Sequence, residues 1–186
     1  MKANKANVWQ VLKHYLPAKF MEDISLDVIQ RICGILDANS FRMDKYGSRG
    51  LYFAISMVNH DCLPNARVVF SSEGRATLMA KKPIKKGQHI SITYCSPLLN
   101  TPTRLAKLKS SKFFTCQCDL CHDPSEKQTY LSALICPKRC KGLLLPNTFY
   151  ESSQDWKCNT CTFMTCGEKV QKLVDAIMNS YLAVSK

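Results

Sequence analysis

Closely spaced cysteines constrain this chain more than any other feature of its sequence. Eleven of the 186 residues are cysteine, and most of them fall in the motifs C-x-C-x2-C, C-x3-C and C-x2-C. These motifs contain Cys116, Cys118 and Cys121, then Cys136 and Cys140, then Cys158 and Cys161. Structural zinc sites take four soft ligands in a tetrahedron, often as short-spaced pairs of this kind. The pattern therefore indicates structural metal sites.

The second and third motifs supply four thiols between them, and their spacing is close to that of a zinc ribbon. The sequence predicts one zinc held by these four residues. The C-x-C-x2-C motif supplies three thiols and needs a fourth ligand from elsewhere. Cys33 and Cys95 stand alone, and Cys33 is interpreted as a core residue. Cys166 is interpreted as a core thiol, with a substitute ligand as the alternative.

A disulfide framework and unrelated buried thiols are the alternatives to metal binding. The N-terminal segment mixes Lys and Asn with apolar residues and lacks the apolar core of a secretory signal. No stretch approaches about 18 consecutive apolar residues, so we expect no membrane contact. The prediction is an intracellular, reducing location, where clustered cysteines favour metal over disulfides. Nucleus and cytoplasm both remain open.

Positive charge is concentrated in the middle of the chain. The formal net charge is +12, and no acidic residue occurs between Gly74 and Cys118. A basic face of this kind favours nucleic acid or acidic protein partners, with a solvated surface as the alternative. The stretch 74–118 lacks the dense aromatic residues of a base-stacking platform. We therefore expect at most weak nucleic-acid contact.

Hydrophobic periodicity predicts a mixed α+β chain. Helices are expected over about 8–20, over 26–38 with Ser25 as N-cap, and from about 170 to 181. A further helix should run from a capping Thr101 to Lys112, with Pro102 at its first position. Strands are expected over 66–70 and 75–80, joined by a turn at 71–74, and over 88–94.

Several segments together resemble a SET domain, the fold of lysine methyltransferases. They are Gly50-Leu51-Tyr52, Asn59-His60-Asp61-Cys62-Leu63-Pro64-Asn65 and Ile90-Ser91-Ile92-Thr93-Tyr94. The C-x-C-x2-C motif resembles a post-SET zinc motif. Asn39-Ser40-Phe41 and Thr103-Arg104…Phe114 narrow the resemblance to the SMYD branch, in which a MYND zinc finger is inserted in the SET domain. The later cysteines, with Trp156, are similar to the arthropod SMYD-like subgroup.

The resemblance covers about residues 20–165 and implies an arrangement of four regions. A helical SET insertion would span 1–48 and a C-terminal SET core 49–114. A post-SET and zinc-ribbon-like region would follow over 115–166, and 167–186 would begin a helical C-terminal domain. The implied fold class is α+β, with an incomplete SET β-fold.

The resemblance also implies a protein-lysine methyltransferase that uses S-adenosylmethionine on a lysine of a histone or another protein. Tyr94 would be the tyrosine of the lysine channel, with a packed core tyrosine as the alternative. Asn59 would bind the amino-acid end of the cofactor, and His60 its adenine side through the backbone. Weaker cofactor contacts are implied for Ser56, Val58, Asn39 and Phe114. A structural histidine and a core phenylalanine are the alternatives for His60 and Phe114.

By the same resemblance, Cys62 would complete the first zinc set with Cys116, Cys118 and Cys121. One metal would then tie the Asn-His segment to the C-terminal wall of the cofactor pocket. Together with Cys136, Cys140, Cys158 and Cys161, this gives two structural zinc sites.

The sequence also departs from the family pattern. We find no glycine-rich G-x-G turn for the cofactor and no C-x2-C pair before residue 116. Lys112 occupies a position where SMYD enzymes can place a second channel tyrosine. We therefore expect an incomplete SET domain that is inactive by itself. The alternative is a non-catalytic zinc module that binds protein or nucleic acid through the basic stretch 74–118.

Overall fold

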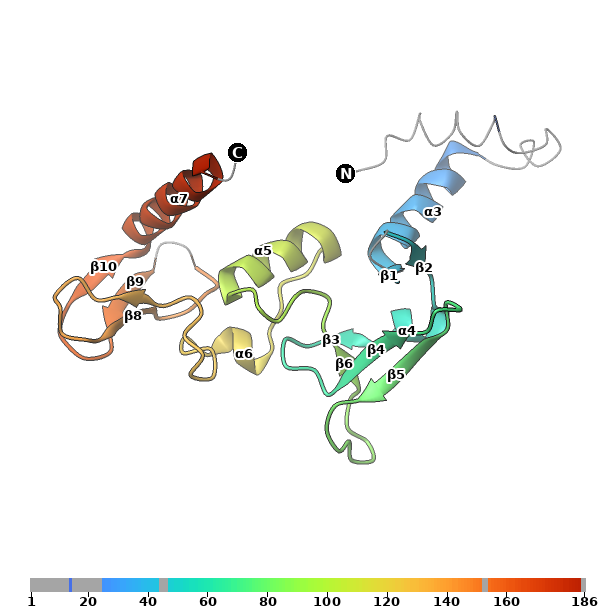
Figure 1. The fold of residues 1–186 in the computed structure, drawn as a ribbon, viewed down its shortest axis with the longest axis horizontal. Coiled ribbons are helices and arrows are strands. Elements are labelled where there is room, and N and C mark those ends of the chain that lie inside the picture. Colours follow the sequence, from blue (N-terminus) through green and yellow to red (C-terminus); the bar gives the residue numbers. More distant parts are fainter. Residues whose placement is uncertain (1–13, 15–24, 44–46, 152–153, 185–186) are drawn as a thin grey trace. The chain divides into compact units, whose positions relative to one another are not determined.

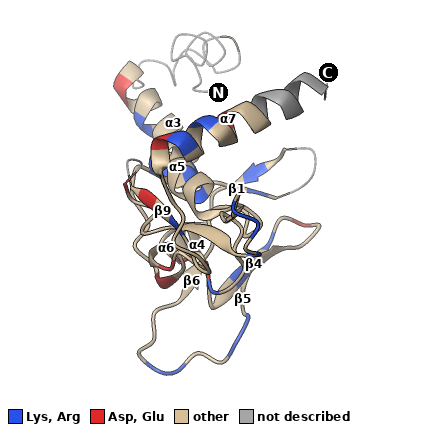
Figure 2. Ribbon diagram, turned by 90° about the vertical axis from the view of Figure 1, so that its left-hand side faces the viewer, with Lys and Arg blue, Asp and Glu red and all other residues tan. Residues whose placement is uncertain are grey.

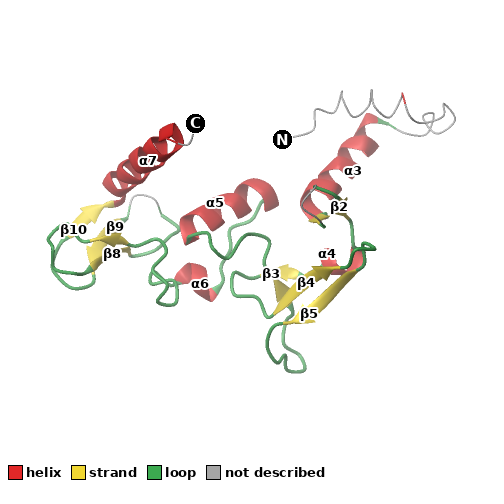
Figure 3. Ribbon diagram, viewed as in Figure 1, coloured by secondary structure: helices red, strands yellow, loops and turns green. Residues whose placement is uncertain are grey.

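The computed structural model describes residue 14 and residues 25–43, 47–151 and 154–184. The helix expected over 8–20 lies almost wholly outside these residues. The chain divides into two compact units (Figures 1 and 3). The first contains residues 1–59 and 66–90, and the second contains residues 60–65 and 91–186. Among the described residues, no helix combines the length and the apolar character that a membrane span requires.

The mixed α+β class is confirmed, with helices and short strands in both units. The first unit contains α3 (Leu26–Asn39), β1 (Phe41–Arg42), β2 (Arg49–Gly50), α4 (Phe53–Ser56), β4 (Ala66–Phe70) and β5 (Ala76–Ala80). At the junction with the second unit lies β3 (Asn59–His60). The second unit continues with β6 (Ser91–Ile92), α5 (Thr101–Lys112), α6 (Asp119–His122), β7 (Leu134–Ile135), β8 (Leu143–Pro146), β9 (Asp155–Cys158), β10 (Met164–Cys166) and α7 (Gly167–Val184).

Helix α3 begins where the sequence predicts. The Ser25 hydroxyl accepts a hydrogen bond from the Val28 N–H at 3.3 Å, which satisfies one of the free donors of the first turn. The expected buried stripe is wrong, however. Ile29 is buried, whereas the four stripe residues Val28, Ile32, Ile35 and Leu36 are 42–50% exposed. Helical periodicity identifies the apolar side of a helix but not whether another element covers that side.

Strands β4 and β5 form the expected antiparallel hairpin, in the register Ala66↔Ala80 to Phe70↔Ala76. Gly74 in the connecting turn has φ +80, a conformation that glycine adopts without steric cost. The rings of Phe41, Tyr52 and Phe70 pack together, with centroids 5.6 to 6.3 Å apart. These three rings give the first unit a small aromatic core.

Strand β6 pairs with β3 and is much shorter than the strand expected over 88–94. Side chains replace the backbone as hydrogen-bonding partners at both of its ends. The Ser91 N–H donates to Asn65 Oδ1 at 2.9 Å, and the Tyr94 N–H donates to His60 Nδ1 at 3.0 Å. The ladder therefore ends on either side of Ser91–Ile92.

Helix α5 follows the predicted range, but its N-cap is Asn100 and not Thr101. Asn100 Oδ1 accepts a hydrogen bond from the Thr103 N–H at 3.1 Å. Thr101 is instead fully buried and donates to Glu126. Leu105 and Leu108 extend from α5 into a core of the second unit that also contains four buried cysteines, with Cys118 packed against it.

The last four strands form one antiparallel sheet in the order β10-β9-β8-β7. Figure 3 shows three of them, β8, β9 and β10. Leu144 pairs with Cys158, and Trp156 pairs with Pro146 and Thr165. Helix α7 follows β10 directly (Figure 1) and agrees with the expected C-terminal helix. Val170 is buried, whereas Leu173 and Ile177 are 52% and 55% exposed.

Candidate metal centres and the adjoining aromatic site

The first cysteine cluster comprises Cys62, Cys116, Cys118 and Cys121. Their four Sγ atoms all lie within 4.8 Å of one another, and three of the residues are buried. Cys62 Sγ is 3.6 Å from Cys121 Sγ and 3.9 Å from Cys116 Sγ. The structure therefore brings the C-x-C-x2-C thiols together with the fourth thiol expected from residue 62.

Local structure holds three of these thiols at the start of α6. Cys118 is the N-cap of α6, and the Cys121 N–H donates to the Cys118 carbonyl at 3.0 Å. The Tyr150 hydroxyl donates to the Cys116 carbonyl at 2.8 Å. Burial, followed by the nearby thiol charges, raises the pKa of Tyr150 to about 12. Tyr150 therefore remains a donor at neutral pH and ties residues 146–151 to the cluster.

Arg104 supplies a buried positive charge beside the first cluster. Its side chain is 1% exposed, and its Nη2 donates to Thr101 Oγ1 at 2.6 Å. Within the described residues its Nε has no hydrogen-bond partner. Burial lowers the pKa of Arg104, but Cys62 and then Cys121 outweigh that effect and raise it.

This setting fits a zinc ion. Four thiolates and one Zn²⁺ carry a net charge of about −2. A buried charge of that sign needs a counter-charge. Arg104 provides a buried cation, with an orphaned donor, next to two of the four thiols. The donor set and its surroundings therefore suit a structural zinc with four sulfur ligands.

The second cysteine cluster comprises Cys136, Cys140, Cys158 and Cys161, whose Sγ atoms also lie within 4.8 Å of one another. Cys136 and Cys161 are 3.7 Å apart, and Cys140 and Cys158 are 3.5 Å apart. These residues flank the strands β7 to β10 at their connections. The four-stranded sheet thus carries a second four-thiol site, as its zinc-ribbon-like spacing predicts.

Backbone donors favour thiolate at this second cluster. The N–H groups of Thr160 and Cys161 donate to Cys158 Sγ at 3.3 and 3.4 Å. Burial raises the pKa of Cys158, but these two hydrogen bonds, together with the neighbouring thiols of Cys140 and Cys136, outweigh it, and the pKa falls to about 6. Thiolate is the form that binds zinc, so this donor set also fits the metal.

An aromatic group adjoins the first cluster. The ring of His60 lies 5.1 Å from that of Tyr94 and 5.9 Å from that of Phe114, between centroids. Tyr94 and Phe114 meet edge to face at 6.4 Å. The Lys112 ammonium lies over the Tyr94 ring, 5.4 Å from its centroid. The face of Tyr94 is therefore suited to a cation.

His60 joins this aromatic group to the first cysteine cluster. Its Nδ1 accepts the Tyr94 N–H at 3.0 Å, and its Nε2 lies 3.3 Å from Cys62 Sγ. A backbone N–H can only donate, so Nδ1 carries no proton in this arrangement. The ring proton then resides on Nε2, which donates to the sulfur.

The other residues expected to contact the cofactor belong to the first unit. They are Asn39, Ser56, Val58 and Asn59. Asn39 Nδ2 donates to the Ile35 carbonyl at 3.1 Å, and the Ser56 hydroxyl donates to the Phe53 carbonyl at 2.8 Å. These two side chains therefore have local partners at α3 and α4. Their contacts with a cofactor stay a prediction.

Sequence reasoning missed three buried residues around the first cluster. Cys95, interpreted as solitary, is 6% exposed in the same core as the four thiols. Arg104, counted in the basic stretch 74–118, and Glu126, for which the sequence predicts no role, are almost fully buried charges. Their positions in the sequence could have indicated proximity to the site. Cys95 follows Tyr94 directly, and Arg104 lies one helical turn after the start of α5.

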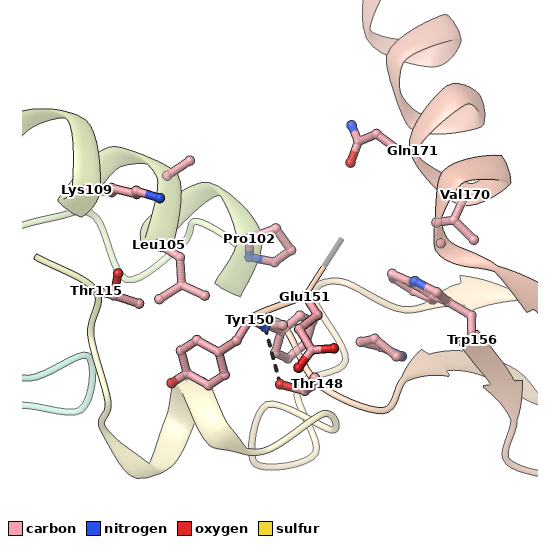
Figure 4. Close-up of a pocket in the computed structure, with 14 residues that line it drawn as sticks. Pro102, Leu105, Lys109, Thr115, Thr148, Tyr150, Glu151, Trp156, Val170 and Gln171 are labelled. Carbon is pink, nitrogen blue, oxygen red and sulfur yellow. Dashed lines mark hydrogen bonds between the residues drawn. The ribbon is translucent and has the colours of Figure 1, made fainter. Parts of the chain in front are cut away.

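A pocket of about 430 Å³ lies outside the predicted site, among α5, residues 146–151, β9 and the start of α7 (Figure 4). Leu105, Tyr150, Trp156 and Val170 contribute apolar surface, and Lys109 contributes a charge. No residue expected to bind the cofactor or a metal lines it.

Lys and Arg residues of the basic stretch occur on the β4–β5 hairpin and on the loop after β5 (Figure 2).

Comparison with known proteins adds independent evidence. Residues 4–95 match the family model described as SET domain. SET domain-containing protein SmydA-8, isoform A, of Drosophila melanogaster is 36% identical over 164 residues, which cover 84% of this chain and 36% of that protein. Histone-lysine N-methyltransferase SET5 of Saccharomyces cerevisiae is 41% identical over 85 residues, covering 45% of this chain and 16% of that protein.

Histone-lysine N-methyltransferase SMYD1 of Homo sapiens is 26% identical over 134 residues, covering 63% of this chain and 27% of that protein. The chain spans about a third of the length of the SmydA-8 isoforms that it matches.

Proposed function

We propose that this chain, which belongs to the SET-domain family and is SMYD-like, forms part of an S-adenosylmethionine-dependent protein-lysine methyltransferase. One observation carries the proposal. The ring of Tyr94 lies beside His60 of the Asn-His segment, and both adjoin a four-thiol cluster that includes Cys62. Relatives named histone-lysine methyltransferases support a lysine of a histone or another protein as the substrate.

Methyl transfer to lysine requires a neutral amine held in line with the methyl group, with water excluded. S-adenosylmethionine supplies the methyl group on a positively charged sulfur. Burial raises the pKa of Tyr94, so its hydroxyl stays protonated at neutral pH. In the proposed mechanism this hydroxyl orients the substrate amine, and the ring offers a face to the positive charge.

The remaining proposed roles concern cofactor binding. Asn59 hydrogen-bonds the amino-acid end of the cofactor, and His60 contacts its adenine side through the backbone. Phe114 packs against the cofactor or lines the channel. Ser56, Val58 and Asn39 make weaker contacts.

Zinc is structural in this proposal. One ion binds Cys62, Cys116, Cys118 and Cys121, and a second binds Cys136, Cys140, Cys158 and Cys161. In the proposed arrangement, the SET insertion spans residues 1–48 and the SET core spans 49–114. The post-SET region spans 115–166, and a helical domain starts over 167–186.

Calorimetric titration of S-adenosylmethionine into the zinc-loaded chain tests the proposal. We expect saturable binding that Asn59→Ala weakens and that Tyr94→Phe leaves nearly unchanged. In an active protein that contains this chain, Tyr94→Phe should abolish methylation of a lysine peptide, because it removes only the hydroxyl. A folded sample with two zinc ions and no cofactor binding would refute cofactor use by this chain.

A second candidate function is a non-catalytic zinc module that binds protein or nucleic acid. The position of the Lys112 ammonium over Tyr94 favours it, because a fixed cation there opposes a cationic substrate. The basic stretch 74–118 would be its contact surface. A steep fall of DNA affinity with salt would support this candidate through phosphate contacts, and a flat dependence would exclude them.

A further inference from the structure

Two hydrogen bonds of one imidazole connect a candidate zinc ligand to the backbone of the proposed channel tyrosine. The Tyr94 N–H donates to His60 Nδ1 at 3.0 Å, and His60 Nε2 lies 3.3 Å from Cys62 Sγ. Because the first bond fixes the proton on Nε2, the second has its donor facing the sulfur. The other tautomer would lose the bond from Tyr94, because two N–H groups would then face each other.

The same ring is also held by packing and by the strand that carries it. His60 belongs to β3, and the following Asp61 N–H donates to the Ile92 carbonyl of β6 at 3.0 Å. Its ring packs at tilted angles against those of Tyr94 and Phe114, with centroids at 5.1 and 5.9 Å. The imidazole therefore has little freedom to move independently of β6 and Tyr94.

The Tyr94 backbone N–H has a side chain, that of His60, as its hydrogen-bond acceptor. Strand β6 ends at Ile92, so Tyr94 lies beyond the ladder. The position of the Tyr94 backbone thus depends on a side-chain acceptor, and that acceptor is oriented by the sulfur on the opposite side of the ring. A thiolate bound to zinc accepts such a hydrogen bond and fixes the ring orientation.

We propose that His60 is a positioning residue whose imidazole couples the metal-bound Cys62 thiolate to the backbone of Tyr94. Metal at the first cluster then fixes where the Tyr94 hydroxyl is presented. This role is additional to the backbone contact with the cofactor assigned to His60 above. Its effect on methyl transfer rests on the proposed function, whereas the hydrogen-bonded coupling itself does not.

Two conservative variants separate the two bonds. In His60→Asn, the amide oxygen lies near the position of Nδ1 and can still accept the Tyr94 N–H, but the donor to Cys62 is lost. In His60→Gln, the amide nitrogen lies near the position of Nε2 and can still donate to Cys62, but the acceptor for Tyr94 is lost. His60→Ala removes both bonds.

Two readouts need no enzyme activity. The first is zinc release to a chelator, measured in a Cys140→Ser background so that only the first cluster retains metal. We expect release to be about 10- to 100-fold faster in His60→Asn and nearly unchanged in His60→Gln. The second is hydrogen exchange of the Tyr94 amide, which should accelerate about tenfold or more in His60→Gln and stay slow in His60→Asn.

Removing zinc from otherwise unaltered protein should also accelerate exchange at Tyr94. The coupling is refuted if His60→Asn and His60→Gln behave alike in both readouts. It is also refuted if the hydrogen-exchange rate of the Tyr94 amide is the same with and without zinc. If methyl transfer is measurable, His60→Gln should lower kcat with little change in the KM for the cofactor. Loss of activity in every variant and in the parent would count against the proposed function alone, because the exchange and release data stand independently.

Discussion

Thr101 donates both its backbone N–H and its hydroxyl to Glu126 Oε1, at 2.7 and 2.6 Å. Glu126 is fully buried, and Ser132 donates its N–H to Oε2 and its hydroxyl to Oε1. The carboxylate therefore lies at the N-terminus of α5, where a negative charge is favoured. Through Thr101 Oγ1 it is also linked to Arg104, and thereby to the first cysteine cluster.

Glu126→Gln should lower the free energy of unfolding by about 1–3 kcal/mol. The amide oxygen can replace Oε1, but the new NH₂ group would face the Ser132 N–H, leaving two buried donors opposed. Urea denaturation of the zinc-loaded chain measures the change. Glu73→Gln, at an exposed turn position, is the control and should stay within about 0.5 kcal/mol. Equal effects in the two variants would contradict a structural role for the buried carboxylate.

Each cysteine cluster should lose its metal independently. Cys118→Ser and Cys140→Ser should each lower the zinc content by one equivalent, because each removes one of four ligands. Only Cys118→Ser should also loosen the core around Leu105 and Leu108, which packs on the first cluster. Metal analysis and hydrogen exchange measure the two effects. An unchanged zinc content in Cys118→Ser would overturn the assignment of the first site.

A left-handed turn near Glu126 predicts a stabilising substitution to glycine. Gln128 is exposed and has φ +66, which costs a non-glycine residue about 1–2 kcal/mol. Gln128→Gly should raise the free energy of unfolding by about 0.5 kcal/mol, since the greater freedom of the unfolded chain offsets part of the relief. Lys107→Gly, inside α5, should instead lower it by about 1 kcal/mol. Destabilisation of similar size in both would argue against the left-handed conformation.

In an active protein that contains this chain, the rate of methyl transfer should rise with pH between 7 and 9. A substrate lysine has a pKa near 10.4, so the fraction of neutral amine grows about tenfold per pH unit in this range. Burial raises the pKa of Tyr94, so its phenol remains protonated throughout. The profile of kcat/KM should therefore show no falling limb below pH 9. A bell-shaped profile with a maximum near pH 8 would show that an ionising group of the protein controls the step.

The sequence was most informative where a local pattern alone determines structure. Ser25 caps α3 and Gly74 occupies the hairpin turn as expected, because both depend on residues only a few positions apart. The second four-thiol set was equally accessible, since its ligand type and spacing are visible in the chain, whereas Cys62 was assigned to the first set through the resemblance alone. Membership of the SET-domain family followed from several motifs occurring in order.

Features that depend on distant partners could not be predicted. Thr101 looks like a cap until Glu126 is known to accept its hydrogen bonds, and the raised pKa of Arg104 depends on the distant thiols of Cys62 and Cys121. The strand expected over 88–94 was too long because side chains of Asn65 and His60 take hydrogen bonds that a ladder would use. Periodicity does not identify such tertiary acceptors.

Lys112 should restrain activity if Tyr94 receives a cationic substrate. Its ammonium lies 5.4 Å from the centroid of the Tyr94 ring and repels a lysine approaching the same face. After screening by solvent, one charge at such a distance is worth about 1 kcal/mol, or about fivefold in rate. Lys112→Met should therefore raise kcat/KM for a lysine peptide by about that factor at low salt.

Lys109→Met, on the same helix and exposed, is the matched control and should have little effect. The gain from Lys112→Met should shrink at about 1 M salt, where charges are screened beyond about 3 Å. A gain that persists at high salt would point to a change in packing around Tyr94. Equal gains in both variants would mean that general surface charge, and not the cation over the ring, limits substrate binding.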